Sequence, residues 1–182
     1  MVYYISLDEY FHLKKEIAMN NTKTKLKQVM DWKAAFISGI ASGIVLLFLV
    51  MLAVPAVMGW NAWVIVRYIS SIFLGQSILP PPASFNLTAL IIALITHSII
   101  SIGSAILLAF IIHRWGLLIG IIGGAIFGLC LYGINFFSLT YFFPWFYLIK
   151  GWPMMVSHII FGAAAGGVYE ALEVEKFVPE KV

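Results

Sequence analysis

Four long apolar stretches constrain this chain more than any other feature of its sequence. They cover residues 34–58, 86–112, 117–139 and 154–172; the first three carry no charged residue, and the fourth carries Glu170 near its end. About twenty residues of helix cross the hydrocarbon of a bilayer, so each stretch is long enough to span it. The chain is 62% hydrophobic and 10% charged, whereas a soluble domain has about a quarter of its residues charged. The sequence therefore predicts an all-α polytopic membrane protein, a bundle of four transmembrane helices.

The segments outside the apolar stretches are predicted to be cytoplasmic tails, residues 1–33 and 173–182. Six of the eleven Lys and Arg residues precede residue 34, which favours a cytoplasmic amino end. No cleavable signal peptide is expected, because about thirty mostly polar residues precede the first apolar stretch, which should stay as an anchor. Met19 is an alternative start to Met1.

The segment 60–79 is apolar but contains Arg67, which would cost about 2.5–3.5 kcal/mol at the centre of a spanning helix. Four spans place nine of the eleven Lys and Arg residues on the cytoplasmic side, and a fifth span would move Arg114 and both carboxy-terminal lysines outside. We therefore expect 60–79 to form an extra helix in the outer interface, in the first outer loop, stopped by the prolines of 80–82.

Glycines at a spacing of four residues mark three of the spans. Such stripes let helix backbones approach closely in lipid, where hydrophobicity drives little association. We expect them to pack the bundle, with docking of a partner subunit on one stripe as the alternative. The helix-packing candidates are Gly39, Gly43, Gly120, Gly124, Gly128, Gly162 and Gly166.

Polar residues within or between the spans are the candidate functional residues: His97, Asn135, His158 and Arg67. Ionisable groups at membrane depth often mark a site or pathway, although a neutral histidine bonded to a neighbouring hydroxyl or carbonyl explains them too. Residue counting puts His97 and His158 about 10 Å apart in depth, which disfavours a haem held by both. Asn135 and His158 lie near the outer ends of their spans, where they could hydrogen-bond.

No catalytic, cofactor-binding or metal-binding residues are assigned, and no cofactor or nucleic acid is expected. The nucleophile elbow, the phosphate-binding glycine loop and the HExxH zinc motif are absent from the sequence, and Cys130 is its single cysteine. The outer loop 140–152 is rich in aromatic residues, which is typical of a membrane-interface belt and also fits a surface for a partner or a quinone.

Four segments carry a resemblance to a known family: 31–36 running into Gly39, 79–85, 128–146, and His158 with 161–162. Together they resemble a family of small bacterial inner-membrane proteins, some of them labelled sodium:proline symporter. The resemblance implies four spans in the bacterial inner membrane over residues 31–173, and it implies no mechanism. Sodium-coupled symporters use inverted repeats and broken helices around a midplane site, and four short spans without internal duplication do not supply them.

The sequence leaves three hypotheses for function. The first is a non-catalytic accessory or assembly subunit of a larger membrane complex, with the bilayer and other membrane subunits as partners. The alternatives are a small oligomeric transporter or channel, and a membrane redox or lipid-modifying protein using His97 or His158.

Overall fold

The computed structural model describes residues 5–20 and 25–180, and it is 79% helical. Four of its helices are long and apolar enough to cross a membrane, which confirms the predicted number of spanning-length helices. They cover Trp32–Met58, Leu87–Ile112, Leu117–Tyr141 and Trp152–Leu172.

The first long helix combines α2 (Trp32–Phe48), a π-helical turn (Leu49–Ala53) and α3 (Val54–Met58). Asp31 begins it, because its carboxylate accepts hydrogen bonds from the N–H groups of Lys33 and Ala34. Pro55 has no N–H to donate to the preceding turn, and the helix continues past it through the wider π turn. Gly59 then ends the helix with a left-handed φ of 67°.

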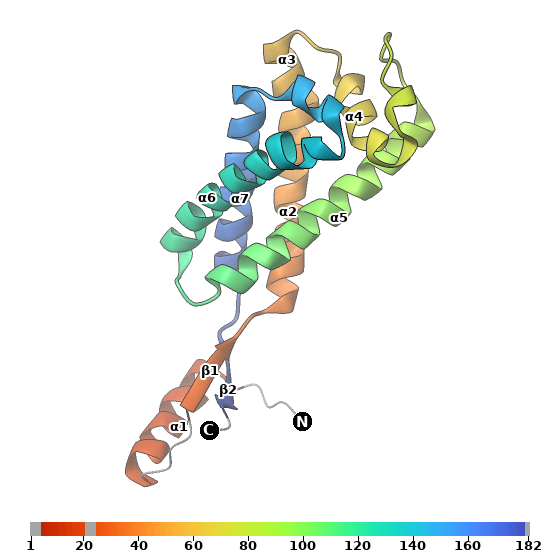
Figure 1. Ribbon diagram of the computed structural model, residues 1–182. Coiled ribbons are helices and arrows are strands. Elements are labelled where there is room, and N and C mark those ends of the chain that lie inside the picture. Colours follow the sequence, from red (N-terminus) through yellow and green to blue (C-terminus); the bar gives the residue numbers. More distant parts are fainter. Residues whose placement is uncertain (1–4, 21–24, 181–182) are drawn as a thin grey trace.

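The fourth helix, α4 (Ala62–Leu74), has thirteen residues and is therefore shorter than a membrane span. It lies within the segment predicted to form an interfacial helix. Asn61 caps its first turn by accepting a hydrogen bond from the Trp63 N–H, and Gly75 follows its last residue. In Figure 1, α4 lies at one end of the bundle, next to the start of α5.

The other long helices are α5 (Leu87–Ile112), α6 (Leu117–Gly133) and α7 (Trp152–Leu172). A π turn (Ile134–Ser138) and a 3-10 turn (Leu139–Tyr141) extend α6, and a 3-10 helix (Pro144–Ile149) precedes α7. Helix α5 packs on α2 and α4, and α6 packs on α7. Contact between α5 and α6 is slight although they are consecutive, and Figure 1 shows α5 running obliquely to α2 and α7.

The two segments predicted as polar tails pair with each other through two short strands, which the hydropathy pattern did not predict. A helix α1 (Leu7–Asn20) precedes strand β1 (Lys25–Val29), and β1 pairs antiparallel with β2 (Lys176–Glu180). Both strands leave the same end of the bundle, so their backbone groups can satisfy one another (Figure 1). We call this the sheet end, and the opposite end, which carries α4, the α4 end.

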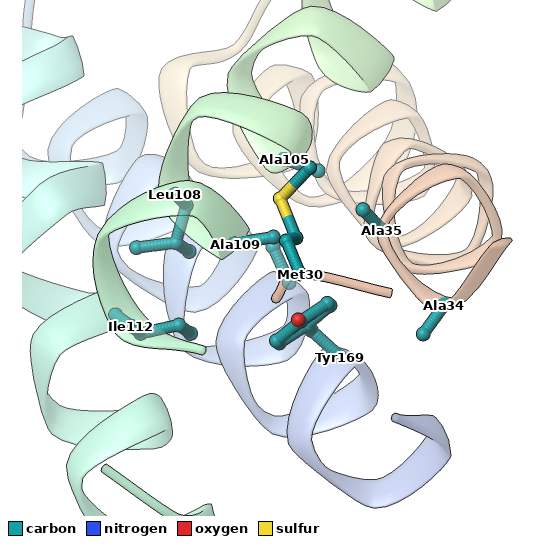
Figure 2. Close-up of a cluster of buried hydrophobic side chains, with 9 residues drawn as sticks. Met30, Ala34, Ala35, Ala105, Leu108, Ala109, Ile112 and Tyr169 are labelled. Carbon is teal, nitrogen blue, oxygen red and sulfur yellow. The ribbon is translucent and has the colours of Figure 1, made fainter. Parts of the chain in front are cut away.

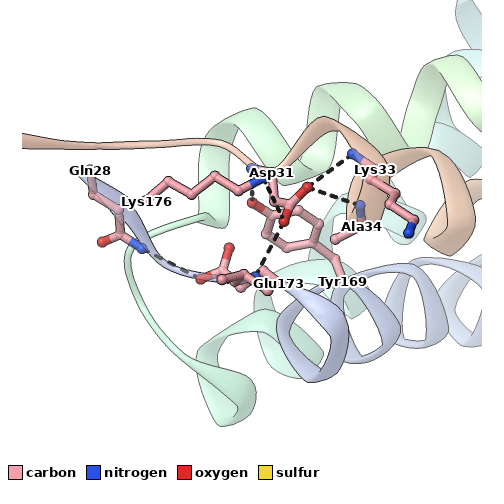
Figure 3. Close-up of polar contacts among 8 residues, drawn as sticks. Gln28, Asp31, Lys33, Ala34, Tyr169, Glu173 and Lys176 are labelled. Atoms are coloured by element: carbon pink, nitrogen blue, oxygen red, sulfur yellow. Dashed lines mark hydrogen bonds and ion pairs between the residues drawn. The ribbon is translucent and has the colours of Figure 1, made fainter. Parts of the chain in front are cut away.

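Asp31 joins the first and last long helices at the sheet end (Figure 3). Its second carboxylate oxygen accepts a hydrogen bond from the Val174 N–H at 3.3 Å and lies 3.1 Å from the Lys176 ammonium. Its own N–H donates to the Tyr169 hydroxyl at 3.3 Å. Burial alone would raise the pKa of this carboxyl, but the bonds from Lys176, Ala34 and Val174 outweigh it and lower the pKa below its ordinary 3.8.

Small side chains fill the core near the sheet end, between α2, α5 and α7. The buried cluster drawn in Figure 2 contains alanines from all three helices, together with larger residues at its edges. Its members are Met30, Ala34, Ala35, Ala105, Leu108, Ala109, Ile112, Ala165 and Tyr169. The alanines of this cluster let the three backbones approach closely.

Candidate functional site: a cavity at the α4 end

A partly open cavity of about 140 Å³ lies in the bundle toward the α4 end. Residues from α2, α4, α5, α7 and the continuation of α6 line it, most of them apolar. Ile100 of α5 and Leu139 beyond α6 line the cavity and are also 49% and 39% exposed. The cavity therefore opens where α5 and α6 part.

Aromatic side chains of α4 and of the loop before α7 contact each other beside the cavity. The Trp145 indole N–H donates to the Ser71 hydroxyl of α4 at 2.8 Å. The rings of Tyr68 and Phe146 meet edge to face with centroids 5.9 Å apart. These contacts join α4 to the 3-10 helix Pro144–Ile149, and Tyr68, Phe146 and Ile149 all line the cavity. Part of the aromatic loop 140–152 therefore packs around the cavity instead of pointing away from the protein.

His158 and Asn135 form a hydrogen-bonded pair in the wall of the cavity. The Nδ1 atom of His158 lies 2.8 Å from the Met154 carbonyl oxygen, and its Nε2 atom lies 3.2 Å from the Asn135 side-chain nitrogen. A carbonyl oxygen can only accept, so Nδ1 carries the proton of the neutral ring, and Nε2 accepts from the amide of Asn135. His158 is buried, and α6 and α7 meet through this pair as well as through their backbones.

His97 lines the same cavity from α5. Its Nε2 atom lies 2.8 Å from the carbonyl oxygen of Gly43 in α2, and the Ser101 hydroxyl lies 3.3 Å from the same nitrogen. Counting residues along upright helices separates His97 from His158 in depth, yet both border one cavity. Helix α5 runs obliquely to α7 (Figure 1), and depth along a tilted helix changes by less than the rise per residue; the difference in depth between the two histidines stays a prediction.

The π turn that carries Asn135 is a feature the apolar pattern gives no sign of. In this turn the Leu139 N–H bonds to the Ile134 carbonyl, five residues back, instead of four. Single π turns inside α-helices occur often at functional sites, because the extra residue changes the direction in which nearby side chains point. Here the turn carries Asn135 and Phe136, which both line the cavity.

Arg67, the remaining polar candidate, forms hydrogen bonds with the loop that follows α4. Its guanidinium donates to the carbonyl oxygen of Ile78 at 3.0 Å and of Ser84 at 3.4 Å, and to the Ser84 hydroxyl at 3.2 Å. These bonds fold the proline-rich segment after α4 back against that helix. Arg67 does not line the cavity.

The glycines spaced four residues apart lie where α6 packs on α7 and where α2 packs on α5. A Cβ atom on Gly124 would run into the Gly162 carbonyl oxygen, and one on Gly166 into that of Gly120; Gly128 likewise abuts the backbone of His158. On α2, a Cβ on Gly39 would lie 2.7 Å from the Cα of Ile102, and one on Gly43 2.9 Å from the Ser101 Cβ. These stripes are occupied internally, so they no longer argue for a partner subunit.

Within residues 5–20 and 25–180, no group of three His, Cys, Asp or Glu side chains is placed to hold a metal ion. Comparison of the chain with protein-family models, curated proteins and solved structures finds no match. The cavity, with His97, Asn135 and His158 in its wall, is therefore the feature on which a function can be argued.

Proposed function

We propose that this protein is a membrane-embedded binding protein that takes a small lipid-soluble molecule into the cavity at the α4 end. The observation that carries the proposal is the cavity itself, which has a mostly apolar wall and an opening between two apolar helices of spanning length. A dry cavity of about 150 Å³ binds benzene, so a cavity of about 140 Å³ is large enough for a single ring or a short chain.

The membrane is the natural source of such a ligand. The exposed residues of the long helices are overwhelmingly apolar, so a bilayer would surround the opening between α5 and α6. A molecule dissolved in lipid could then enter sideways without crossing water. This route requires the helices to span the membrane, which their length and composition support.

Binding can be measured with fluorobenzene by fluorine NMR, using the whole chain in lipid nanodiscs and empty nanodiscs as the correction for partition into lipid. We expect saturable binding to the protein. Ser104→Leu should remove most of it, because Ser104 lines the cavity and a larger side chain there fills the space. Gly103→Leu is the matched control, since Gly103 is exposed on the same helix and meets nothing within 4 Å.

Two results would reject the proposal. Wild-type protein that takes up no more fluorobenzene than empty nanodiscs has no such site. Equal binding by Ser104→Leu and Gly103→Leu would put the ligand somewhere other than this cavity.

The proposed orientation has the sheet end in the cytoplasm of a bacterial cell and the cavity in the outer half of the inner membrane. The positive-inside rule supports it, because Arg114 and Lys176 lie at the sheet end with the basic amino-terminal segment. In a Cys130→Ser background, an impermeant thiol reagent on intact cells should label Ser77→Cys and Lys150→Cys but not Lys27→Cys or Glu175→Cys. Labelling of the last two from outside would reverse the orientation.

A second candidate, an accessory subunit of a larger membrane complex, is favoured by the surface of the outer aromatic loop. Tyr141 is 85% exposed, Phe142 68% and Leu148 73%, and Tyr is enriched among residues that dominate binding interfaces. Gentle extraction from the native membrane should then give a band well above 20.3 kDa that contains other subunits. A pure homo-oligomer would instead favour a small oligomeric transporter or channel, and a monomer would exclude both.

A further inference from the structure

We infer that the molecule held in the cavity carries a hydrogen-bond donor, a hydroxyl group, that binds to the side-chain oxygen of Asn135. This inference rests on the proposed function and adds the chemical class of the ligand: a small hydroxylated apolar molecule, such as a phenol or a lipid-soluble alcohol.

The proton on the His158 ring fixes the orientation of the Asn135 amide. Because Nδ1 donates to the Met154 carbonyl oxygen, Nε2 of the neutral ring has a lone pair and no proton. The Asn135 side chain must therefore turn its nitrogen toward Nε2, as the 3.2 Å contact has it. The same assignment follows whichever way the amide is first drawn, since an amide oxygen facing Nε2 would bring two acceptors together.

The orientation of the amide leaves its oxygen available. Within residues 5–20 and 25–180, no hydrogen bond involves the side-chain oxygen of Asn135, and the residue itself lines the cavity. His97 adds a second acceptor by the same reasoning: Nε2 donates to the Gly43 carbonyl oxygen, so Nδ1 has the lone pair, and no hydrogen bond in the described ranges involves it. An acceptor in an apolar wall is satisfied by a ligand that donates.

The hydroxyl groups in the cavity wall are compatible with a ligand that donates a hydrogen bond. Ser104 and Tyr68 line the cavity with hydroxyl groups, which can donate or accept. A ligand that only accepts, such as a quinone or a ketone, would leave the Asn135 oxygen without a partner. A ligand with a hydroxyl group satisfies it and places its apolar part against the aliphatic and aromatic wall.

The inference is tested by comparing 4-fluorophenol with 4-fluoroanisole, which has a methoxy group in place of the hydroxyl and cannot donate. Both are measured by fluorine NMR on the wild-type chain in nanodiscs and corrected for partition into empty nanodiscs. We expect the phenol to bind roughly 2- to 10-fold more tightly, the value of one hydrogen bond of about 0.5–1.5 kcal/mol. Equal affinities would overturn the inference without touching the proposed function, which is decided by fluorobenzene binding to the wild type and to the Ser104→Leu and Gly103→Leu variants.

Asn135→Leu identifies the acceptor, with Ser138→Leu as the matched control on an exposed position of the same π turn. The preference for the phenol should be smaller in Asn135→Leu than in Ser138→Leu; some preference remains, because Nδ1 of His97 and the Nε2 of His158 that loses its donor are still acceptors. An equal preference in the two variants would overturn the assignment to Asn135. If Asn135→Leu does not fold, the wild-type comparison of the two probes still decides whether the ligand donates.

Discussion

The two ends of the helix bundle differ in the size of the side chains between their helices, and they are packed to different degrees. Toward the sheet end, alanines of α2, α5 and α7 and glycines of α6 and α7 bring the backbones into direct contact. Toward the α4 end, larger side chains lie between the helices, among them Tyr68, Phe136, Phe146 and Phe161, and they border a cavity of about 140 Å³.

The difference has a simple physical cause. Small residues in lipid let helices gain dispersion contacts along their whole backbones, so one close arrangement is favoured. Large rings hold the helices apart, and their flat shapes do not fill a space bounded by several elements without gaps. The closely packed end can therefore serve as a rigid base, and the α4 end can keep a cavity without endangering the fold.

The largest effect should come from adding bulk to the closely packed end. Gly166→Leu puts a side chain where the Gly120 carbonyl oxygen lies, so α6 and α7 must separate. We expect a loss of stability at or above about 3 kcal/mol, the upper end of the range for overpacked cores. Thermal unfolding in mild detergent measures it. Gly103→Leu, which meets open space, should melt within a few degrees of wild type; equal melting of both variants would contradict the packing argument.

An intermediate effect is expected from the histidines of the cavity wall. His158→Leu removes two hydrogen bonds at a buried position and leaves the Asn135 amide unpaired, which should cost about 1–3 kcal/mol. His97→Leu removes the bond to the Gly43 carbonyl from a half-buried ring, for about 0.5–1.5 kcal/mol. Denaturation of both variants against wild type gives the order, and a larger loss for His97→Leu would mean that the α2–α5 contact matters more than the α6–α7 pair.

The smallest effect concerns the charge on Asp31 at the sheet end. Asp31→Asn keeps an oxygen that can cap α2 but removes the ion pair with Lys176, which is partly exposed, and the acceptor of the Val174 N–H, so the loss should be about 1 kcal/mol at neutral pH. Because the folded protein lowers the pKa of Asp31, its carboxylate stabilises the fold above pH 3.8. That contribution is lost as the pH falls below 3.8 toward the lowered value. Melting of wild type and variant should therefore converge in acid; a gap that does not change with pH would contradict the ion-pair account.

Hydropathy predicted the helical architecture because a spanning helix is a local property: the length and composition of each stretch are sufficient. The pairing of β1 with β2 could not be predicted in this way, since the two strands are short, charged and separated by the whole helical region. Asp31 caps α2 locally, but its bonds to Val174 and Lys176 depend on that same long-range pairing and could not be predicted from the sequence.

The sequence predicted individual residues of the candidate site, but it did not predict the cavity that they border. His97, Asn135 and His158 could be chosen because polar residues are rare in apolar stretches, and the proximity of Asn135 to His158 followed from their positions near neighbouring span ends. Counting residues separated His97 from His158 in depth, and it could not show that both residues border one cavity. The cavity depends on the angle between α5 and α6 and on the π turn at Asn135, and neither leaves a periodic signal in the sequence.

The most direct test of the difference between the two ends uses a phenyldiazirine, a photoreactive label little larger than benzene that dissolves in the bilayer. After photolysis of the protein in nanodiscs, mass spectrometry identifies the labelled residues. Phe136 and Phe161 line the cavity, and Leu108 and Tyr169 belong to the core at the sheet end; all four are at most 4% exposed. We predict labelling of Phe136 and Phe161 that Ser104→Leu suppresses, and none of Leu108 or Tyr169. Equal labelling of all four residues, or labelling confined to exposed lipid-facing positions, would contradict an open cavity at the α4 end.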